Sequence, residues 1–326
     1  MYPTMKKKKQ TFLIKFAKKI LSALKRREFR LYGHKFSKKT YTLHQHIVLL
    51  ALREYQKGMG FRQFCNLLPD FGPLLDFLKL TKIPHFTTLH KVSCRLKGSL
   101  LEDLFLGFAS KGKLHTDIDS TGLSLQHSTY YYEKRLEHFR KTKKPRKRGR
   151  PRKRRRKKHQ YTNLFVDLDK QIILAIKLAK GSKSDNKMMI PTIKKAKILF
   201  DQIESFDADR GYDAEYNHAY VNEIMKSSDF IKLKNVHIPV HKTNGTYRKK
   251  AKRKLRNKIG RPRKNHRNKA ETIMFVIKKT FGEHITAIKV KNQRNQTRFR
   301  IIAYNAYRLI FYFIQSISTR PANRKL

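Results

Sequence analysis

Acidic residues are scarce in this chain, which has 23 Asp and Glu against 78 Lys and Arg among its 326 residues. A net charge of +55 opposes compaction unless a polyanion neutralises it, and nucleic acid does so through its phosphates. We therefore expect a nucleic-acid-binding protein. A basic packaging protein without chemistry is the plainer alternative, and it predicts sequence-independent, salt-dependent binding with no metal requirement.

Cysteine is also rare, and long apolar runs are missing. The two cysteines, Cys65 and Cys94, lie in apolar helical patterns and form no Cys-x-x-Cys pair. This usage fits a reducing compartment and argues against a zinc site. No stretch approaches 18 uncharged apolar residues, so we expect no membrane span. Together these features predict a cytoplasmic, nucleoid-associated protein without a membrane partner or a small-molecule substrate.

The N-terminal segment, residues 1–39, is basic and contains one helical pattern. Phe12, Phe16, Ile20 and Leu24 recur at helical spacing, while lysines interrupt the apolar run that a signal peptide would need. We expect a basic amphipathic helix that packs on the protein or on DNA. Binding to a membrane surface is the alternative.

Residues 40–110 predict a helical DNA-binding domain. Apolar spacing indicates helices over 41–55 and 61–71, and a third over 90–98 with Thr87 or Thr88 as its N-cap. Short helices separated by Gly and Pro resemble a helix-turn-helix, whose last helix enters a major groove. A helical bundle that only packs is the alternative.

From residue 111 to residue 318 strands alternate with helices, and a tail follows over 319–326. The expected strands are 113–120, a hairpin at 161–181 with its turn at 167–170, 203–207 and 230–240. The expected helices are 185–199, 216–225, 267–281 and 299–317. This order predicts an α/β domain whose central mixed sheet is flanked by helices, which is the order of the ribonuclease H-like fold.

Two basic tracts interrupt this domain, at about 137–160 and 243–266. In the first, 15 of the 19 residues from Arg140 to Lys158 are Lys or Arg. Runs of like charge predict disorder until they meet phosphate. The RGRP segment at 148–151 resembles an AT-hook, which places arginine in a narrow A·T-rich minor groove; generic polybasic loops are the alternative. The candidate DNA-binding residues of the tracts are Arg148, Arg150, Arg152, Arg261 and Arg263.

Three of the scarce acids, Asp119, Asp209 and Glu271, lie in patterned segments. Phosphodiester cleavage with two metal ions needs carboxylates that hold the ions about 3.5–4 Å apart. The expected sheet places Asp119 at the end of its first strand and Asp209 just after its fourth, and Glu271 could reach them from a helix. The sequence therefore permits a metal-dependent nuclease or strand-transfer site. Asp117, on the same strand face, is the alternative to Asp119.

The segment around Asp209 reads DADRGYD. We expect Gly211 to allow a tight turn after the strand and Asp213 to cap the following helix. Asp207 is the nearest rival of Asp209.

The chain resembles the DDE transposases of prokaryotic insertion sequences in four segments: IDST, DADRGYD, RNKAETIMFVIK and RIIAYNAYRLI. In the third segment Arg267 precedes Glu271 by four residues and Lys278 follows it by seven, as in the family's signature. Lys264 stands where that signature usually has Tyr. FRQFCNLL and KIPHFTTLHKV are also similar to the family, so the resemblance covers about residues 40–315.

The resemblance implies a metal-dependent transposase with endonuclease and strand-transfer activity. Asp119, Asp209 and Glu271 would hold two Mg²⁺ or Mn²⁺ ions, while Arg267 and Lys278 would hold phosphate. The enzyme would cut double-stranded DNA at the ends of its element and join the 3′ ends to target DNA, as a dimer or higher oligomer. The alternatives are a catalytically inactive DNA-binding relative of these transposases and a ribonuclease H-like nuclease.

Overall fold

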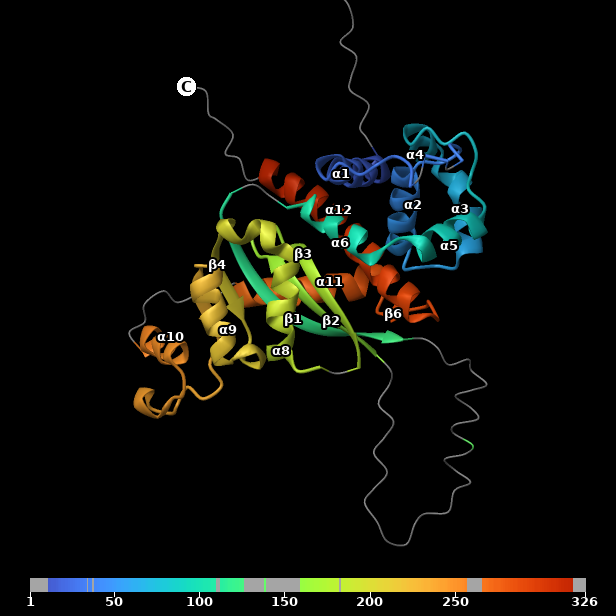
Figure 1. The fold of residues 1–326 in the computed structure, drawn as a ribbon. Helices are drawn as coiled ribbons and strands as arrows, with labels where there is room; N and C mark the ends of the chain where they lie inside the picture. Colours follow the sequence, from blue (N-terminus) through green and yellow to red (C-terminus); the bar gives the residue numbers. More distant parts are fainter. Residues whose placement is uncertain are drawn as a thin grey trace, which may run out of the picture.

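The computed structural model describes residues 11–33, 35–36, 38–109, 112–125, 138, 159–181, 183–256 and 266–318. Much of the two basic tracts lies outside these residues, including Arg148, Arg150, Arg152, Arg261 and Arg263. The described part is built on one six-stranded sheet with helices on both faces and a group of helices beside it (Figure 1).

The sheet is mixed, with strand order β3-β2-β1-β4-β5. Its first three strands are antiparallel neighbours, whereas β4 and β5 run parallel to β1, and β6 pairs in parallel with the end of β1. The strands are β1 (Leu114–Leu125), β2 (His159–Asp167), β3 (Ile172–Lys180), β4 (Ile203–Ala208), β5 (Ser228–Ile231) and β6 (His284–Ile285). This arrangement confirms the predicted α/β, ribonuclease H-like fold class with its preceding helical region.

Local chemistry explains the β2–β3 hairpin, which forms where the sequence predicted it. The side chain of Asp167 accepts hydrogen bonds from the backbone N–H groups of Asp169 at 2.9 Å and Lys170 at 3.3 Å, so it holds the turn. Both strands are buried, and β2 contributes to two cores in alternation: Phe165 faces one, and Leu164 and Val166 face the other.

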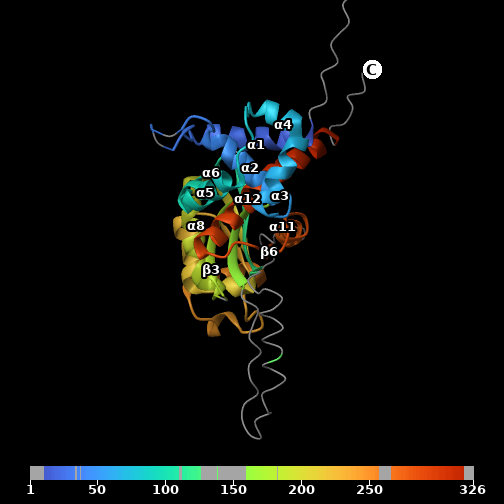
Figure 2. The same cartoon turned by 90° about the vertical axis from the view of Figure 1, so that its right-hand side faces the viewer.

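Each face of the sheet has its own layer of helices. Figure 1 shows α8 and α9 in front of the sheet and α11 and α12 behind it, and Figure 2 shows the sheet between α8 and α11. The front core includes Met189, Ile193, Phe206 and Val221. The front elements are α8 (Asp185–Ile193), η2 (Lys194–Gln202), η3 (Arg210–Tyr212), α9 (Glu215–Ala219) and η4 (Tyr220–Ile224).

The N-terminal helices pack against the rear layer and share its hydrophobic core. The long helix α12 joins them to the sheet: Arg300 on α12 is fully buried and contacts Glu54 on α2 at 3.4 Å. The elements are α1 (Phe12–Arg26), α2 (Leu43–Tyr55), α3 (Phe61–Leu67), η1 (Leu68–Phe71), α4 (Gly72–Phe77), α5 (Phe86–Arg95), α6 (Gly98–Leu106), α11 (His266–Phe281) and α12 (Val290–Ser318).

The basic helix α1 uses its apolar stripe to pack on the protein. Phe16, Ile20 and Leu24 are fully buried, and the ring of Phe12 lies 5.3 Å from that of Tyr55 on α2. Within the described ranges, no helix is long and apolar enough to cross a membrane.

Several predicted boundaries were wrong because pairing partners distant in sequence decide them. β1 continues to Leu125, since β2 and β6 pair with its second half. β5 ends at Ile231 and does not extend to 240, because Ile231 pairs with Ala208, the last residue of β4. The expected helix 185–199 is divided at Ala196, whose backbone is not helical.

Among the N-terminal helices, α4 and α6 were not predicted, and the expected cap of the third helix was wrong. α5 begins at Phe86 with His85 as its N-cap, so Thr87 and Thr88 lie inside its first turn. The hydroxyl of Thr87 instead lies 2.8 Å from the Nδ1 atom of His85.

The second basic tract is partly helical, although its charge predicted disorder. Its first part forms α10 (Thr246–Arg256), which projects from the front layer (Figure 1). The carboxylate of Glu215 accepts hydrogen bonds from the backbone N–H groups of Tyr247 at 2.7 Å and Arg248 at 3.0 Å. An acid at the start of a helix offsets its dipole, and here it anchors an otherwise repulsive sequence. The short turn η5 (Val240–Lys242) precedes α10.

Candidate active site

The register of β1 against β4 brings Asp119 and Asp209 together. Ile118 and Ala208 are partners on these parallel strands. Asp119 directly follows Ile118 in the sequence, and Asp209 directly follows Ala208. Asp119 therefore lies beside the carboxyl end of β4. It lies in the middle of β1, not at its end as predicted, because β1 continues along β2.

The charges of four acids meet around Asp119. Burial raises the pKa of Asp119, and the carboxylates of Asp209, Asp185 and Glu271 raise it further, against a hydrogen bond from the backbone N–H of Ser120. The side chain of Asp209 is 56% exposed, and its Oδ1 atom lies 3.4 Å from the Nζ atom of Lys232. The acids of this group thus repel one another close to solvent.

Asp117, the alternative to Asp119, occupies a different environment. It is buried, and its partner in the neighbouring strand is Asp207. Burial raises its pKa well above the ordinary value, and the charges of Asp207 and Asp119 raise it further. Asp119 is more accessible than Asp117, as a residue that binds an ion or a substrate has to be.

Asp185, in the first turn of α8, was missed by the sequence analysis. Its Oδ1 atom accepts hydrogen bonds from Ser120 Oγ at 2.9 Å and from the hydroxyl of Tyr161. Burial and this contact raise the pKa of Tyr161 to about 12, so its hydroxyl remains a donor. The only local signal was an acid at the start of a helix, which usually indicates a favourable interaction with the helix dipole and no more.

The structure gives Gly211 a role other than the predicted one. Its φ angle is outside the left-handed region, so the turn does not depend on glycine's conformational freedom. Instead, a Cβ atom at this position would lie 2.9 Å from Oδ2 of Asp185. Glycine is needed because the carboxylate approaches the backbone closely.

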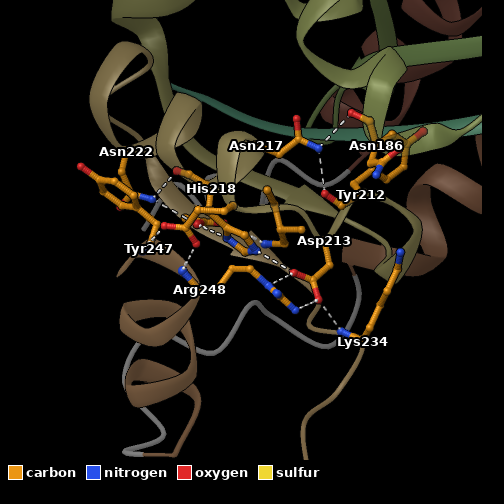
Figure 3. A network of polar contacts seen from close by, with 12 residues as sticks. Asn186, Tyr212, Asp213, Asn217, His218, Asn222, Lys234, Tyr247 and Arg248 are labelled. Carbon is orange, nitrogen blue, oxygen red and sulfur yellow. Dashed lines mark hydrogen bonds and ion pairs between the residues drawn. The ribbon is translucent and has the colours of Figure 1, made fainter. Parts of the chain in front are cut away.

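Asp213, predicted as a helix cap, is instead the centre of a buried ionic network (Figure 3). Its carboxylate accepts hydrogen bonds from Arg248 Nε at 2.7 Å and from the backbone N–H of Lys234 at 2.8 Å. His218 lies between Asp213 and Asp229, with ring nitrogens 3.4 Å and 2.6 Å from their carboxylates. The network joins α10, α9 and β5.

The pKa values of this network reflect neutralised charge. Burial alone would raise the pKa of Asp213, but hydrogen bonds from His218 and Arg248 outweigh it and lower the pKa strongly. Burial alone would lower the pKa of His218, but the two neighbouring aspartates raise it to about 9. The imidazole is therefore charged at neutral pH and both aspartates have a cationic partner.

The donor set around Asp119 fits a divalent ion in chemistry and in charge. Mg²⁺ prefers hard carboxylate oxygens, and a bound cation would relieve the mutual repulsion of the acids. Within the described residues, however, no three His, Cys, Asp or Glu side chains lie close enough together to enclose a metal ion. Asp119, Asp209 and Glu271 thus interact through their charges without forming a closed ligand set.

The two other residues of the family signature lie on α11, as does Glu271. Lys278 is half-buried two turns after Glu271, a spacing that places both on one side of the helix. The side chain of Arg267 lies outside the described set.

One comparison identifies the domain that carries this site. Residues 110–306 match the family described as the transposase DDE domain, a match that spans more than half of the chain. No curated protein matches the chain. The matched region contains every strand of the sheet and all four interacting acids. The chain belongs to the transposase DDE domain family.

Proposed function

We propose that this transposase cuts double-stranded DNA at the ends of its own insertion sequence and joins the 3′ ends to target DNA. The observation that carries the proposal is the register of β1 and β4, which sets Asp119 beside Asp209 at the carboxyl end of β4. The charge of Glu271 reaches the same place from α11. The family accounts for DNA as the substrate in general terms.

In this proposal Asp119, Asp209 and Glu271 hold two divalent ions, Mg²⁺ or Mn²⁺. Bound ions would supply activation of the attacking oxygen and stabilisation of the leaving oxygen, for hydrolysis and then for transesterification. Asp119 is fixed within a paired strand, whereas Asp209 and Glu271 are exposed and accessible to a phosphodiester. The fixed acid sets the position of the site, and the exposed acids complete it.

The basic residues are proposed to hold the DNA. Lys278 and Arg267 would contact phosphate beside Glu271, with Arg267 able to form two parallel hydrogen bonds. Arg148, Arg150, Arg152, Arg261 and Arg263 would neutralise phosphates farther along the duplex. Because both ends of the element must be joined in one complex, we propose that a dimer or higher oligomer forms on DNA.

A cleavage assay tests the proposal with a matched pair of variants. The substrate is a duplex carrying the ends that flank the gene, and the enzyme is wild type, Asp209→Asn or Asp201→Asn, in Mg²⁺, Mn²⁺ or EDTA. Asp201 is an exposed acid just before the amino end of β4, whereas Asp209 follows its carboxyl end. Replacing Asp201 therefore makes the same charge change at the other end of the strand. We expect Asp209→Asn to lower the cleavage rate by more than about 100-fold while DNA binding persists.

Asp201→Asn should cleave as the wild type does, and EDTA should abolish cleavage by both. If the wild-type protein binds the ends but cuts them neither in Mg²⁺ nor in Mn²⁺, the proposal is contradicted, and the protein is a catalytically inactive DNA-binding protein. Metal-dependent cutting with no preference for the ends would indicate a ribonuclease H-like nuclease instead.

A further inference from the structure

We propose that Asp185 is a positioning residue of this site: through a hydrogen bond from Ser120 and close packing against Gly211, it fixes the spacing between the segments that carry Asp119 and Asp209. The inference rests on the proposed function, because that spacing matters only if the two aspartates hold ions together. Asp185 comes from α8, an element that contributes no residue to the family's acid signature as this chain shows it.

One contact of Asp185 leads directly to Asp119. Its Oδ1 atom accepts the hydroxyl hydrogen of Ser120, at 2.9 Å, and Ser120 is the residue that follows Asp119 in β1. The backbone N–H of Ser120 donates a hydrogen bond to Asp119 Oδ1 at 2.7 Å. The same residue thus receives its position from Asp185 and holds the carboxylate of Asp119.

The opposite side of Asp185 leads to Asp209. Its Oδ2 atom lies against Gly211, two residues after Asp209, closely enough that a Cβ atom there would be 2.9 Å away. A side chain in contact with both Ser120 and Gly211 fixes the separation of β1 from the turn after β4. Any change in that separation would move the two proposed ligands relative to each other.

Tyr161 on β2 completes the frame. Its hydroxyl donates to the same Oδ1 atom of Asp185, and Asn163 donates to Tyr161 at 3.2 Å and to the hydroxyl of Tyr212 at 2.8 Å. Tyr212 is 1% exposed and belongs to the same turn as Gly211. The turn after β4 is therefore tied to β2 through two tyrosines as well as to Asp185.

A positioning role and a ligand role make different demands on Asp185. Positioning needs a hydrogen-bond acceptor at Oδ1, which asparagine keeps, whereas ion binding by Asp185 itself needs the negative charge. Alanine removes both properties. The three side chains therefore separate the two roles at one position.

The test measures Mn²⁺ binding to the full chain without DNA, from the electron paramagnetic resonance signal of the free ion. Wild type is compared with Asp185→Ala, Asp185→Asn, Tyr161→Phe and, as a control for the site itself, Asp209→Asn. We expect Asp185→Ala to weaken Mn²⁺ affinity by about 10–100-fold, the range for residues that orient ligands, and Asp185→Asn to restore most of that loss. Tyr161→Phe should weaken affinity measurably, by up to about tenfold, since one of the two contacts to Oδ1 remains.

Thermal unfolding followed by circular dichroism identifies variants that fail to fold, and Tyr161→Phe carries the test if Asp185→Ala is one of them. Binding that depends on Asp209 but is unchanged in both Asp185→Ala and Tyr161→Phe would overturn the positioning role alone. An equal loss in Asp185→Asn and Asp185→Ala would also overturn it, because the charge would then be what matters. Mn²⁺ binding that does not depend on Asp209 would contradict the proposed site, and this inference with it.

Discussion

Asp209 and Asp213 lie four residues apart in one segment, yet the fold gives them different surroundings. Asp213 is fully buried and faces Arg248 and His218, which lower its pKa. Asp209 is exposed, and together with Asp185 and Glu271 it raises the pKa of Asp119. Acids that face cations in the interior stabilise a fold, whereas acids that face acids near solvent are suited to bind a cation.

The two clusters also differ in what they connect. The Asp213 network joins the basic helix α10 to α9 and β5 (Figure 3). The Asp119 cluster collects side chains from β1, the turn after β4, α8 and α11. The first cluster is closed within the protein. The second gathers negative charge at the carboxyl end of β4, in a chain where acids are scarce.

Removing one acid from each cluster should give the largest contrast. Asp213→Ala leaves Arg248 and His218 without their shared carboxylate, and we expect the free energy of unfolding to fall by about 3–5 kcal/mol. Asp209→Asn removes an exposed charge that repels Asp119 and pairs with Lys232 at 3.4 Å, so the free energy of unfolding should change by less than about 1 kcal/mol. Urea denaturation followed by circular dichroism measures both. Equal losses in the two variants would contradict the distinction between the clusters.

The pH dependence of stability should reveal the charged imidazole of His218. Its pKa is raised from 6.5 to about 9, so the protonated form contributes stability fully below pH 6.5, and this contribution is lost as pH rises through about 9. Over that window we expect a loss of roughly 2–3 kcal/mol. The measurement compares urea denaturation of wild type and His218→Gln from pH 6 to pH 10. A stability difference between the two proteins that does not shrink with rising pH would show that the imidazole is neutral.

A methyl group on Gly211 should disturb the acid cluster and spare the ionic one. The added carbon would lie 2.9 Å from Oδ2 of Asp185, so we expect Gly211→Ala to cost about 1–2 kcal/mol of stability and to lower DNA cleavage by roughly tenfold or more. Gly33→Ala is the matched control, because Gly33 is exposed and the added carbon there meets no atom within 4 Å other than those of its chain neighbours. Cleavage by Gly211→Ala at the wild-type rate would mean that the position of Asp185 is unimportant.

The smallest effect on stability is expected on the outer side of α10. Arg248 turns inward to Asp213, whereas Arg253 is exposed on the same helix. We expect Arg253→Gln to change stability by less than about 0.5 kcal/mol and to reduce the slope of log affinity against log salt by about 0.9 for duplex DNA. The control is Lys113→Gln, whose side chain is 81% exposed at the start of β1. An equal change in slope for both variants would show that α10 makes no particular contact with DNA.

Local patterns were sufficient for the elements that depend on local chemistry. The β2–β3 hairpin follows from two short apolar runs joined by an Asp-rich turn, and α11 from its helical spacing. The limits of β1 and β5 could not be predicted, because strands end where their partners end. Helix α10 could not be predicted for the same reason. Its own sequence contains only like charges that repel one another, and the acids that bind it, Asp213 and Glu215, lie more than 30 residues earlier.

Asp185 was hidden from sequence analysis for a related reason. In sequence it is an ordinary acid at the start of a helix, 66 residues after Asp119 and 24 before Asp209. Only the packing of α8 on the sheet places its carboxylate between Ser120 and Gly211. Gly211 shows the converse error, since its segment predicted a turn that needed glycine, and the structure requires glycine for space.

The sequence by itself determined the large excess of positive charge, the α/β order, and the three patterned acids that led to the family. These properties follow from composition and from local periodicity, which do not depend on contacts between residues distant in sequence. Tertiary structure alone decided which acids repel and which are neutralised, because the charge that an aspartate meets depends on residues tens of positions away. Folding leaves Asp209 exposed beside other acids and Lys232, whereas it buries Asp213 against Arg248 and His218.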